Sequence, residues 1–144
     1  MHAPDPSFAS RVRDSFGRQK AMALIGASLE SVEAGEVEIA LPYRDDLTQQ
    51  KGFIHGGILG MIADTACGYA AFSLMPAGGS LVTVEYKMNI LTPGRGSLVA
   101  RGRVIRPGRT LTVARAEVYA DDGSHVATML QTLMALPDRP DRPE

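Results

Sequence analysis

Residues 56–75 form a long run of apolar and small residues that contains no proline and a single charged side chain, the carboxylate of Asp64. Pro76 and the pair Gly78-Gly79 follow the run, and residues of these types commonly end a helix. The pattern predicts one helix from about Gly56 to Met75. Because this helix is apolar or small on every side, we expect it to be buried rather than to lie on the surface.

The rest of the chain predicts strands that could wrap such a helix. Four candidates follow it: Ser80–Leu91, Ser97–Ile105, Thr110–Ala120 and His125–Leu136. They are separated by TPGRG, RPGR and DDGS, which are typical turn sequences. Residues 27–41 alternate between apolar and polar around Ala34-Gly35, which predicts a hairpin. Short connections favour antiparallel pairing, so we expect an α+β fold in which an antiparallel sheet of about six strands wraps one long central helix.

The chain predicts one domain with two terminal extensions. Phe8, Val12 and Phe16 recur at four-residue spacing, so residues 1–19 are expected to form an N-terminal helical extension. Residues 20–136 form the predicted domain. Residues 137–144 are charged and rich in proline, which predicts a disordered tail.

Composition argues against several classes of function. The net charge is −1 and no basic stripe occurs, which disfavours nucleic-acid binding. The single cysteine, Cys67, fits a reducing compartment, and the polar N-terminus does not resemble a secretory signal, so we expect a cytoplasmic protein. Asp64 and the small residues around it disfavour a membrane span. His2, His55 and His125 share no spacing of metal ligands, so no metal is expected.

Asp64 is the most informative residue of the predicted helix. It is the only carboxylate between Lys51 and Glu85, a segment without lysine or arginine, so no charge partner is near it in sequence. A buried unpaired carboxylate is costly. Either Asp64 is solvated or caps something locally, or it is an acid held in a pocket of low polarity for general-base or nucleophilic chemistry.

The segment His55-Gly56-Gly57 precedes this helix. Two glycines at a helix start leave backbone N–H groups uncovered, and these groups can hold an oxyanion or a polarised carbonyl. A plain glycine-rich turn is the simpler alternative. Together with Asp64, the donors form half of an acyl-transfer site.

These residues resemble the hotdog-fold acyl-CoA thioesterases of the phenylacetate-degradation type. The resemblance rests on Gln49, Gly52, Ile54, HGG at 55–57 and Asp64, on the helix text LGMIADTACGYAA, on the strand LVTVEYKMNILTPGRG and on the segment RPGRTLTVARAEVYADDGSHVATMLQTLMAL. It covers about residues 20–136.

The resemblance implies an enzyme that hydrolyses aryl- or medium-chain acyl-CoA to the free acid and CoA. Asp64 would be the nucleophile or general base, and the Gly56 N–H would polarise the carbonyl. Gln49 and Thr83 would position water or the leaving group, and His55 would support the loop. Gly68 stands where some relatives carry a hydroxyl residue.

The resemblance also implies how CoA and a partner subunit would be bound. Gly57 and the turn residues Arg106, Gly108, Arg109 and Thr110 would hold CoA, with Arg95 in a neighbouring turn completing a basic groove. No cofactor is expected beyond CoA as part of the substrate. A homodimer or homotetramer would place Gln49 of one subunit beside Asp64 of another.

Two questions stay open at the level of sequence. The domain could bind acyl-CoA without hydrolysing it, in which case Asp64 would be incidental. The acyl group is also undetermined, although Met61, Cys67, Leu74 and Met75 could line its pocket. A hotdog dehydratase resembles the chain less, because no F-P-G-H loop occurs.

Overall fold

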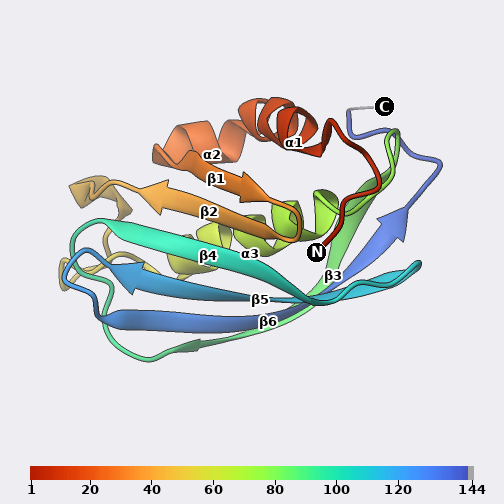
Figure 1. Cartoon of the computed structure of the whole chain (residues 1–144). Helices are drawn as coiled ribbons and strands as arrows, with labels where there is room; N and C mark the ends of the chain where they lie inside the picture. Colours follow the sequence, from red (N-terminus) through yellow and green to blue (C-terminus); the bar gives the residue numbers. More distant parts are fainter. Residues whose placement is uncertain (143–144) are drawn as a thin grey trace.

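The structure is a computed structural model that describes residues 1–142 of the chain. One long helix, α3 (Gly56–Phe72), lies in the concave face of a curved six-stranded sheet (Figure 1). The sheet order is β1-β2-β4-β5-β6-β3, and every neighbouring pair is antiparallel. The strands are β1 (Ser28–Glu33), β2 (Glu36–Leu41), β3 (Ser80–Ile90), β4 (Leu98–Arg106), β5 (Leu111–Ala120) and β6 (His125–Leu136). The predicted α+β architecture is confirmed.

The helix and the sheet approach each other closely because the residues between them are small. A Cβ atom on Gly102 of β4 would lie 2.3 Å from the backbone carbonyl of Ala66, so only glycine fits there. Alanines also line this contact on both sides, and all of them are fully buried: Ala63, Ala66, Ala70, Ala100, Ala114 and Ala116. The sequence therefore sets the depth at which α3 is embedded in the sheet.

The end of α3 differs from the prediction. The helix ends at Phe72, and the chain continues to Met75 in a tighter turn, in which Leu74 donates to the carbonyl of Ala71 and Met75 to that of Phe72. The guanidinium of Arg11 lies 4.4 Å from the centre of the Phe72 ring and donates to the carbonyl oxygen of Met75 at 2.7 Å. A cation that satisfies the last carbonyls stabilises this helix end.

The N-terminal extension is packed onto the domain. Helices α1 (Phe8–Gly17) and α2 (Lys20–Ile25) lie beside β1 and over one side of α3 (Figure 1). Val12, Met22 and Ile25 are buried in the same core as α3. A short 3-10 helix, Asp45–Leu47, lies in the loop between β2 and α3.

Strand β3 forms an edge of the sheet, because in the described part of the chain it pairs only with β6. Its apolar side chains Val82, Val84 and Tyr86 remain 43%, 54% and 46% exposed. A long exposed apolar edge strand is a template for pairing with another strand.

The C-terminal segment has defined contacts where the sequence predicted disorder. Within the described residues 137–142, Asp141 pairs at 3.0 Å with Arg18, which follows α1, and accepts a hydrogen bond from Ser15 of α1. The carboxylate of Asp141, one of the charges that suggested disorder, is used in these contacts. Residues 143 and 144 of the predicted tail lie outside the described residues.

Candidate active site

Asp64 lies half-buried on α3 and is held by two neutral side chains from the far edge of the sheet. Thr83 of β3 donates its hydroxyl to Asp64 Oδ1 at 2.8 Å, and Gln131 of β6 donates Nε2 to the same oxygen. Within residues 1–142, Asp64 Oδ2 accepts no hydrogen bond, and Asp64 has no basic partner. One carboxylate oxygen is thus fixed in place while the other is left available.

Gln131 was missed at the level of sequence, although it orients the site. It is fully buried, and its Nε2 also donates to Thr83 Oγ1 at 2.7 Å. Its Oε1 is buried and has no partner within residues 1–142. Rotating the amide would bring Oε1 against the carboxylate of Asp64, so the orientation is fixed by charge. The sequence did contain an indication of this role. In the alternating pattern of the strand, Gln131 occupies an inward position between the apolar residues Met129 and Leu133, where a polar side chain is unusual.

Asp64 and Thr83 line an open cavity of about 310 Å³ between α3, β3 and the N-terminal helices. Met61 and Gly68 of α3 also line it. Of the residues predicted for an acyl pocket, only Met61 is found here. Cys67 is fully buried on another side of α3, where burial, together with the negative charges of Asp64 and Glu117, raises the pKa of its thiol.

The remaining two predicted pocket residues belong elsewhere. Leu74 and Met75 line a separate apolar cavity of about 420 Å³ near the C-terminal end of α3. Pro107 and Arg109 of the β4–β5 turn lie at the same cavity. The residues predicted to line one acyl pocket therefore line two separate cavities, with Met61 at one and Leu74 and Met75 at the other.

The N-terminus of α3 is capped by His55. Its Nδ1 accepts a hydrogen bond from the Gly57 N–H at 2.8 Å, which requires Nδ1 to be unprotonated. The Gly57 donor is therefore occupied, and the prediction that it binds CoA lacks a free N–H. The Gly56 N–H, in contrast, has no acceptor within residues 1–142, as expected for the first residue of a helix.

Gly56 and Asp64 of one chain are too far apart to act on one carbonyl. They are eight residues apart on α3, which corresponds to about 12 Å along the helix axis. Gln49 is also not brought to Asp64 within the chain, since its side-chain oxygen accepts a hydrogen bond from the Lys51 N–H in the loop before α3. These two groups could meet Asp64 only if they came from another copy.

The predicted CoA-binding turn lies at the opposite end of the molecule from Gly56. Arg106, Gly108, Arg109 and Thr110 are exposed at the connection between β4 and β5, near the C-terminal end of α3 (Figure 1). The N–H of Gly108 donates to Thr112 Oγ1 at 3.3 Å, so this glycine shapes the turn.

The expectation that Arg95 joins these arginines in one groove is wrong. Arg95 precedes β4 and lies over the ring of Phe53 at 4.4 Å, whereas Arg106 ends the same nine-residue strand. At about 3.3 Å per residue, the strand separates them by more than 25 Å. Two consecutive turns that flank one strand lie at opposite ends of that strand, as these two do on β4.

Within residues 1–142 there is no group of three or more His, Cys, Asp or Glu side chains that could hold a metal ion. The same residues contain no helix that is both long and apolar enough to cross a membrane.

A comparison with family models matches residues 51–127 to the model described as the thioesterase superfamily. The match spans 77 of the 144 residues and includes α3, Thr83 and the turn at 106–110. The chain belongs to the thioesterase superfamily. Its class of reaction is therefore thioester hydrolysis.

Individual relatives of this thioesterase agree with the assignment. A crystal structure of a thioesterase family protein from Silicibacter pomeroyi is 50% identical, covers 90% of this chain and 98% of that chain, and has a TM-score of 0.87. A Halobacterium salinarum protein named "Putative esterase" is 34% identical over 67% of this chain and 68% of its own length.

A more distant structure supports the fold. The E. coli PaaI protein from the phenylacetic acid degradation operon is 20% identical and has a TM-score of 0.81, with 90% of this chain and 96% of that chain covered. The resemblance to hotdog thioesterases that the sequence suggested is confirmed.

Proposed function

We propose that this thioesterase hydrolyses acyl-CoA, with Asp64 as the catalytic carboxylate. The observation that carries the proposal is the arrangement of Asp64, whose Oδ1 is held by Thr83 and Gln131 while Oδ2 is free at a cavity. A thioester is already activated, so an oriented carboxylate and one carbonyl donor suffice without a serine nucleophile. No cofactor takes part, since CoA is the leaving half of the substrate.

The carboxylate has two ways to reach the products. As a general base, Asp64 Oδ2 removes a proton from water, and the water oxygen bonds to the thioester carbon. The C–S bond then breaks, and the thiolate of CoA takes up a proton. As a nucleophile, Asp64 bonds to the same carbon, releases CoA and is freed when water cleaves the resulting anhydride. Both routes consume one water and give one acid and one thiol.

The proposed site requires two copies of the chain. The exposed apolar edge of β3 offers the pairing surface, and Thr83 lies on that strand next to Asp64. Pairing there would bring Gly56 of the partner subunit toward Asp64, so that its free N–H polarises the thioester carbonyl. Gln49 of the partner subunit would come from the same loop. A homodimer is the smallest assembly with a complete site.

The exposed turn at 106–110 is proposed to bind the CoA phosphates through Arg106 and Arg109, whose forked guanidinium groups suit phosphate. Replacing both arginines by alanine should raise KM for acyl-CoA and leave kcat nearly unchanged. An unchanged KM would remove this turn from the substrate site.

The main experiment measures thiol release from a panel of aryl- and medium-chain acyl-CoA esters. The parent protein should release CoA, and Asp64→Ala should lower kcat by about a hundredfold or more. Hydrolysis by Asp64→Ala at the parent rate contradicts the mechanism. Tight binding of acyl-CoA without thiol release from the parent would instead favour a binding domain.

A subunit-mixing experiment tests the shared site. Gly56→Pro removes the N–H at the first helical position, where proline is well tolerated. Gly56→Ala is its matched control, because it adds the same contact with Ile90 but keeps the N–H. Co-expressed Gly56→Pro and Asp64→Ala chains should regain activity, since a hybrid dimer has one intact site. Hybrids as inactive as either single variant would place Gly56 and Asp64 in the same chain's site.

A further inference from the structure

The cavity next to Asp64 has a second polar side that the proposed reaction does not use. Ser15 of α1, Tyr69 of α3 and Asp141 of the C-terminal segment line it together with Asp64 and Thr83. Between the two sides lies Gly68, where an added Cβ would meet nothing within 4 Å. The missing side chain at this position keeps the cavity open from one side to the other.

The hydrogen bonds at this second side have a fixed direction. Ser15 has one hydroxyl hydrogen and donates it to Asp141 Oδ2, because an ionised carboxylate only accepts. Ser15 therefore accepts the hydrogen of the Tyr69 hydroxyl at 3.1 Å. The Tyr69 oxygen also has a hydrogen bond with the side chain of Gln19, which lines the cavity too, whereas Asp141 Oδ1 accepts no hydrogen bond within residues 1–142. Ser15 and Tyr69 consequently have no free hydroxyl hydrogen on this side of the cavity, and Asp141 Oδ1 is its open acceptor.

The Tyr69 hydroxyl is maintained as a neutral donor to Ser15. Burial raises the pKa of Tyr69, outweighing the opposite effect of its hydrogen bonds with Ser15 and Gln19. The direction of the chain from Tyr69 through Ser15 to Asp141 therefore persists at neutral pH.

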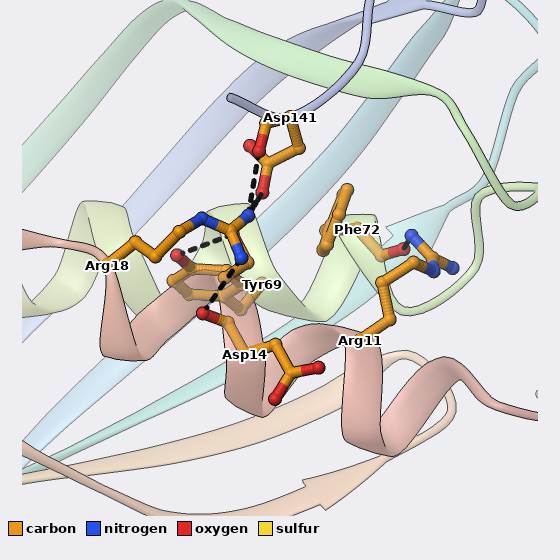
Figure 2. A network of polar contacts seen from close by, with 7 residues as sticks. Arg11, Asp14, Arg18, Tyr69, Phe72 and Asp141 are labelled. Carbon is orange, nitrogen blue, oxygen red and sulfur yellow. Dashed lines mark hydrogen bonds and ion pairs between the residues drawn. The ribbon is translucent and has the colours of Figure 1, made fainter. Parts of the chain in front are cut away.

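Arg18 positions the carboxylate of Asp141. Its guanidinium donates to the Asp141 backbone oxygen at 2.7 Å and to Oδ2 at 3.0 Å, and Figure 2 shows the two side chains pointing toward each other over Tyr69. Arg18 does not line the cavity. It acts on the site by holding the C-terminal segment in place and by pairing with the charge of Asp141.

We infer that this cavity receives the acyl group of the substrate, and that Asp141, Ser15 and Tyr69 select acyl groups with a hydrogen-bond donor, such as a hydroxyl, at the far end. The inference rests on the proposed function, since it takes Asp64 as the reacting end. A volume of about 310 Å³ suits a compact acyl group, because a cavity of about 150 Å³ already holds benzene. An apolar chain end would leave these acceptors without water or a donor, and a terminal carboxylate would be repelled by Asp141.

The test compares three CoA esters of equal length: hexanoyl-, 6-hydroxyhexanoyl- and adipoyl-CoA, with the eight-carbon set as a second length. Asp64 and Tyr69 are separated by about 7.5 Å along α3, which is the reach of such chains. The parent should show a kcat/KM for the hydroxyl ester about tenfold above that for the apolar ester, the effect of one hydrogen bond to a charged group. The adipoyl ester should be the poorest.

Variants assign the preference to the C-terminal segment. Asp141→Ala should reduce the hydroxyl preference to about twofold or less and relieve the penalty on the adipoyl ester. Arg18→Ala should also reduce the hydroxyl preference, because Asp141 loses the partner that holds it at the cavity. Asp138→Ala and Arg13→Ala are matched controls, since both residues are exposed and neither lines the cavity. They should leave both ratios at the parent values.

Failure of the inference differs from failure of the proposed function. If esters are hydrolysed but the hydroxyl ester is not preferred at either length, or if Asp141→Ala keeps the parent ratios, the inference is overturned. If no ester is hydrolysed, the proposed function fails. Calorimetry with the same esters then measures whether the cavity binds the hydroxyl ester more tightly than the other two. Tighter binding of the hydroxyl ester that is lost in Asp141→Ala supports the inference, and equal binding of all three overturns it.

Discussion

Two carboxylates, on opposite faces of the same sheet, are held in contrasting ways. Asp64 lies on the concave side and, among the residues that the structure describes, receives hydrogen bonds only from the neutral side chains of Thr83 and Gln131. Glu117 of β5 lies on the outer face and accepts hydrogen bonds from Arg115, His125 and Thr128. Strand β6 supplies donors to both, because alternate residues of a strand point to opposite faces.

The difference separates an anion whose two oxygens are both engaged from the carboxylate that we propose to be catalytic. Both oxygens of Glu117 are engaged, since Oε1 accepts from Arg115 and Thr128 and Oε2 lies 2.6 Å from His125 Nε2. Burial acts to raise the pKa of Glu117, but the hydrogen bonds from Arg115, His125 and Thr128 outweigh it, and the pKa is lowered. Within residues 1–142, Asp64 has no cation beside it, and one of its oxygens accepts no hydrogen bond.

The largest expected effect tests the difference between Asp64 and Glu117 directly. Asp64→Asn keeps the shape but removes the charge, and should lower kcat for acyl-CoA by about 10²–10³-fold. Glu117→Gln is the matched change on the outer face and should leave kcat within about twofold, because Glu117 does not line the cavity. Steady-state thiol release measures both. Equal losses in the two variants would mean that Asp64 is no more catalytic than Glu117.

The next effect concerns Gln131, which orients Asp64 without reaching the cavity. Gln131→Met should lower kcat about tenfold, since Asp64 Oδ1 and Thr83 lose a fixed donor. The free energy of unfolding should stay within about 1 kcal/mol of the parent, because the change also removes a buried oxygen without a partner. Kinetics and urea denaturation measure the two quantities. A large loss of stability at unchanged kcat would make Gln131 purely structural.

The sequence predicted the parts of this arrangement that depend on local order. The apolar run of α3, the turn sequences and the alternating strands each specify an element by themselves. Three of the five strand pairings, β1 with β2, β4 with β5 and β5 with β6, join strands that are consecutive in the chain. Asp64 could also be singled out from local sequence, because it is the one carboxylate in an apolar run.

What the sequence did not predict depends on distant packing. Gln131 reaches Asp64 only because β6 and β3 pair beside α3, and Arg95 is separated from Arg106 by the length of β4. Asp141 looked like one charge in a proline-rich tail, yet its partners, Ser15 and Arg18, lie more than 120 residues earlier. A charge pattern does not reveal such a pairing.

A smaller effect is expected from the Thr83 hydroxyl, which lies on the concave side. Thr83→Val removes a donor to Asp64 but leaves Gln131 in contact with the same oxygen, so kcat should fall only about threefold to tenfold. Thr132→Val is the control, since the Thr132 hydroxyl donates to Glu85 instead. It should leave kcat near the parent value. A greater loss in Thr132→Val than in Thr83→Val would contradict the assignment of Thr83 to the site.

The smallest effect is on stability and appears only as pH changes. The pKa of Glu117 is lower in the folded chain than in the unfolded chain, where a glutamate has its ordinary value near 4.3. The ionised Glu117 therefore stabilises the fold above about pH 4.3, and this contribution is lost as the pH falls through the folded-state pKa. Glu117→Gln should have a lower free energy of unfolding than the parent at pH 7, and the difference should shrink steadily below pH 4. Urea denaturation of both proteins across this range measures it. A difference that stayed constant from pH 7 to pH 3 would show that Glu117 stabilises the fold through packing and not through its charge. The contrast with Asp64 as two differently held anions would then fail.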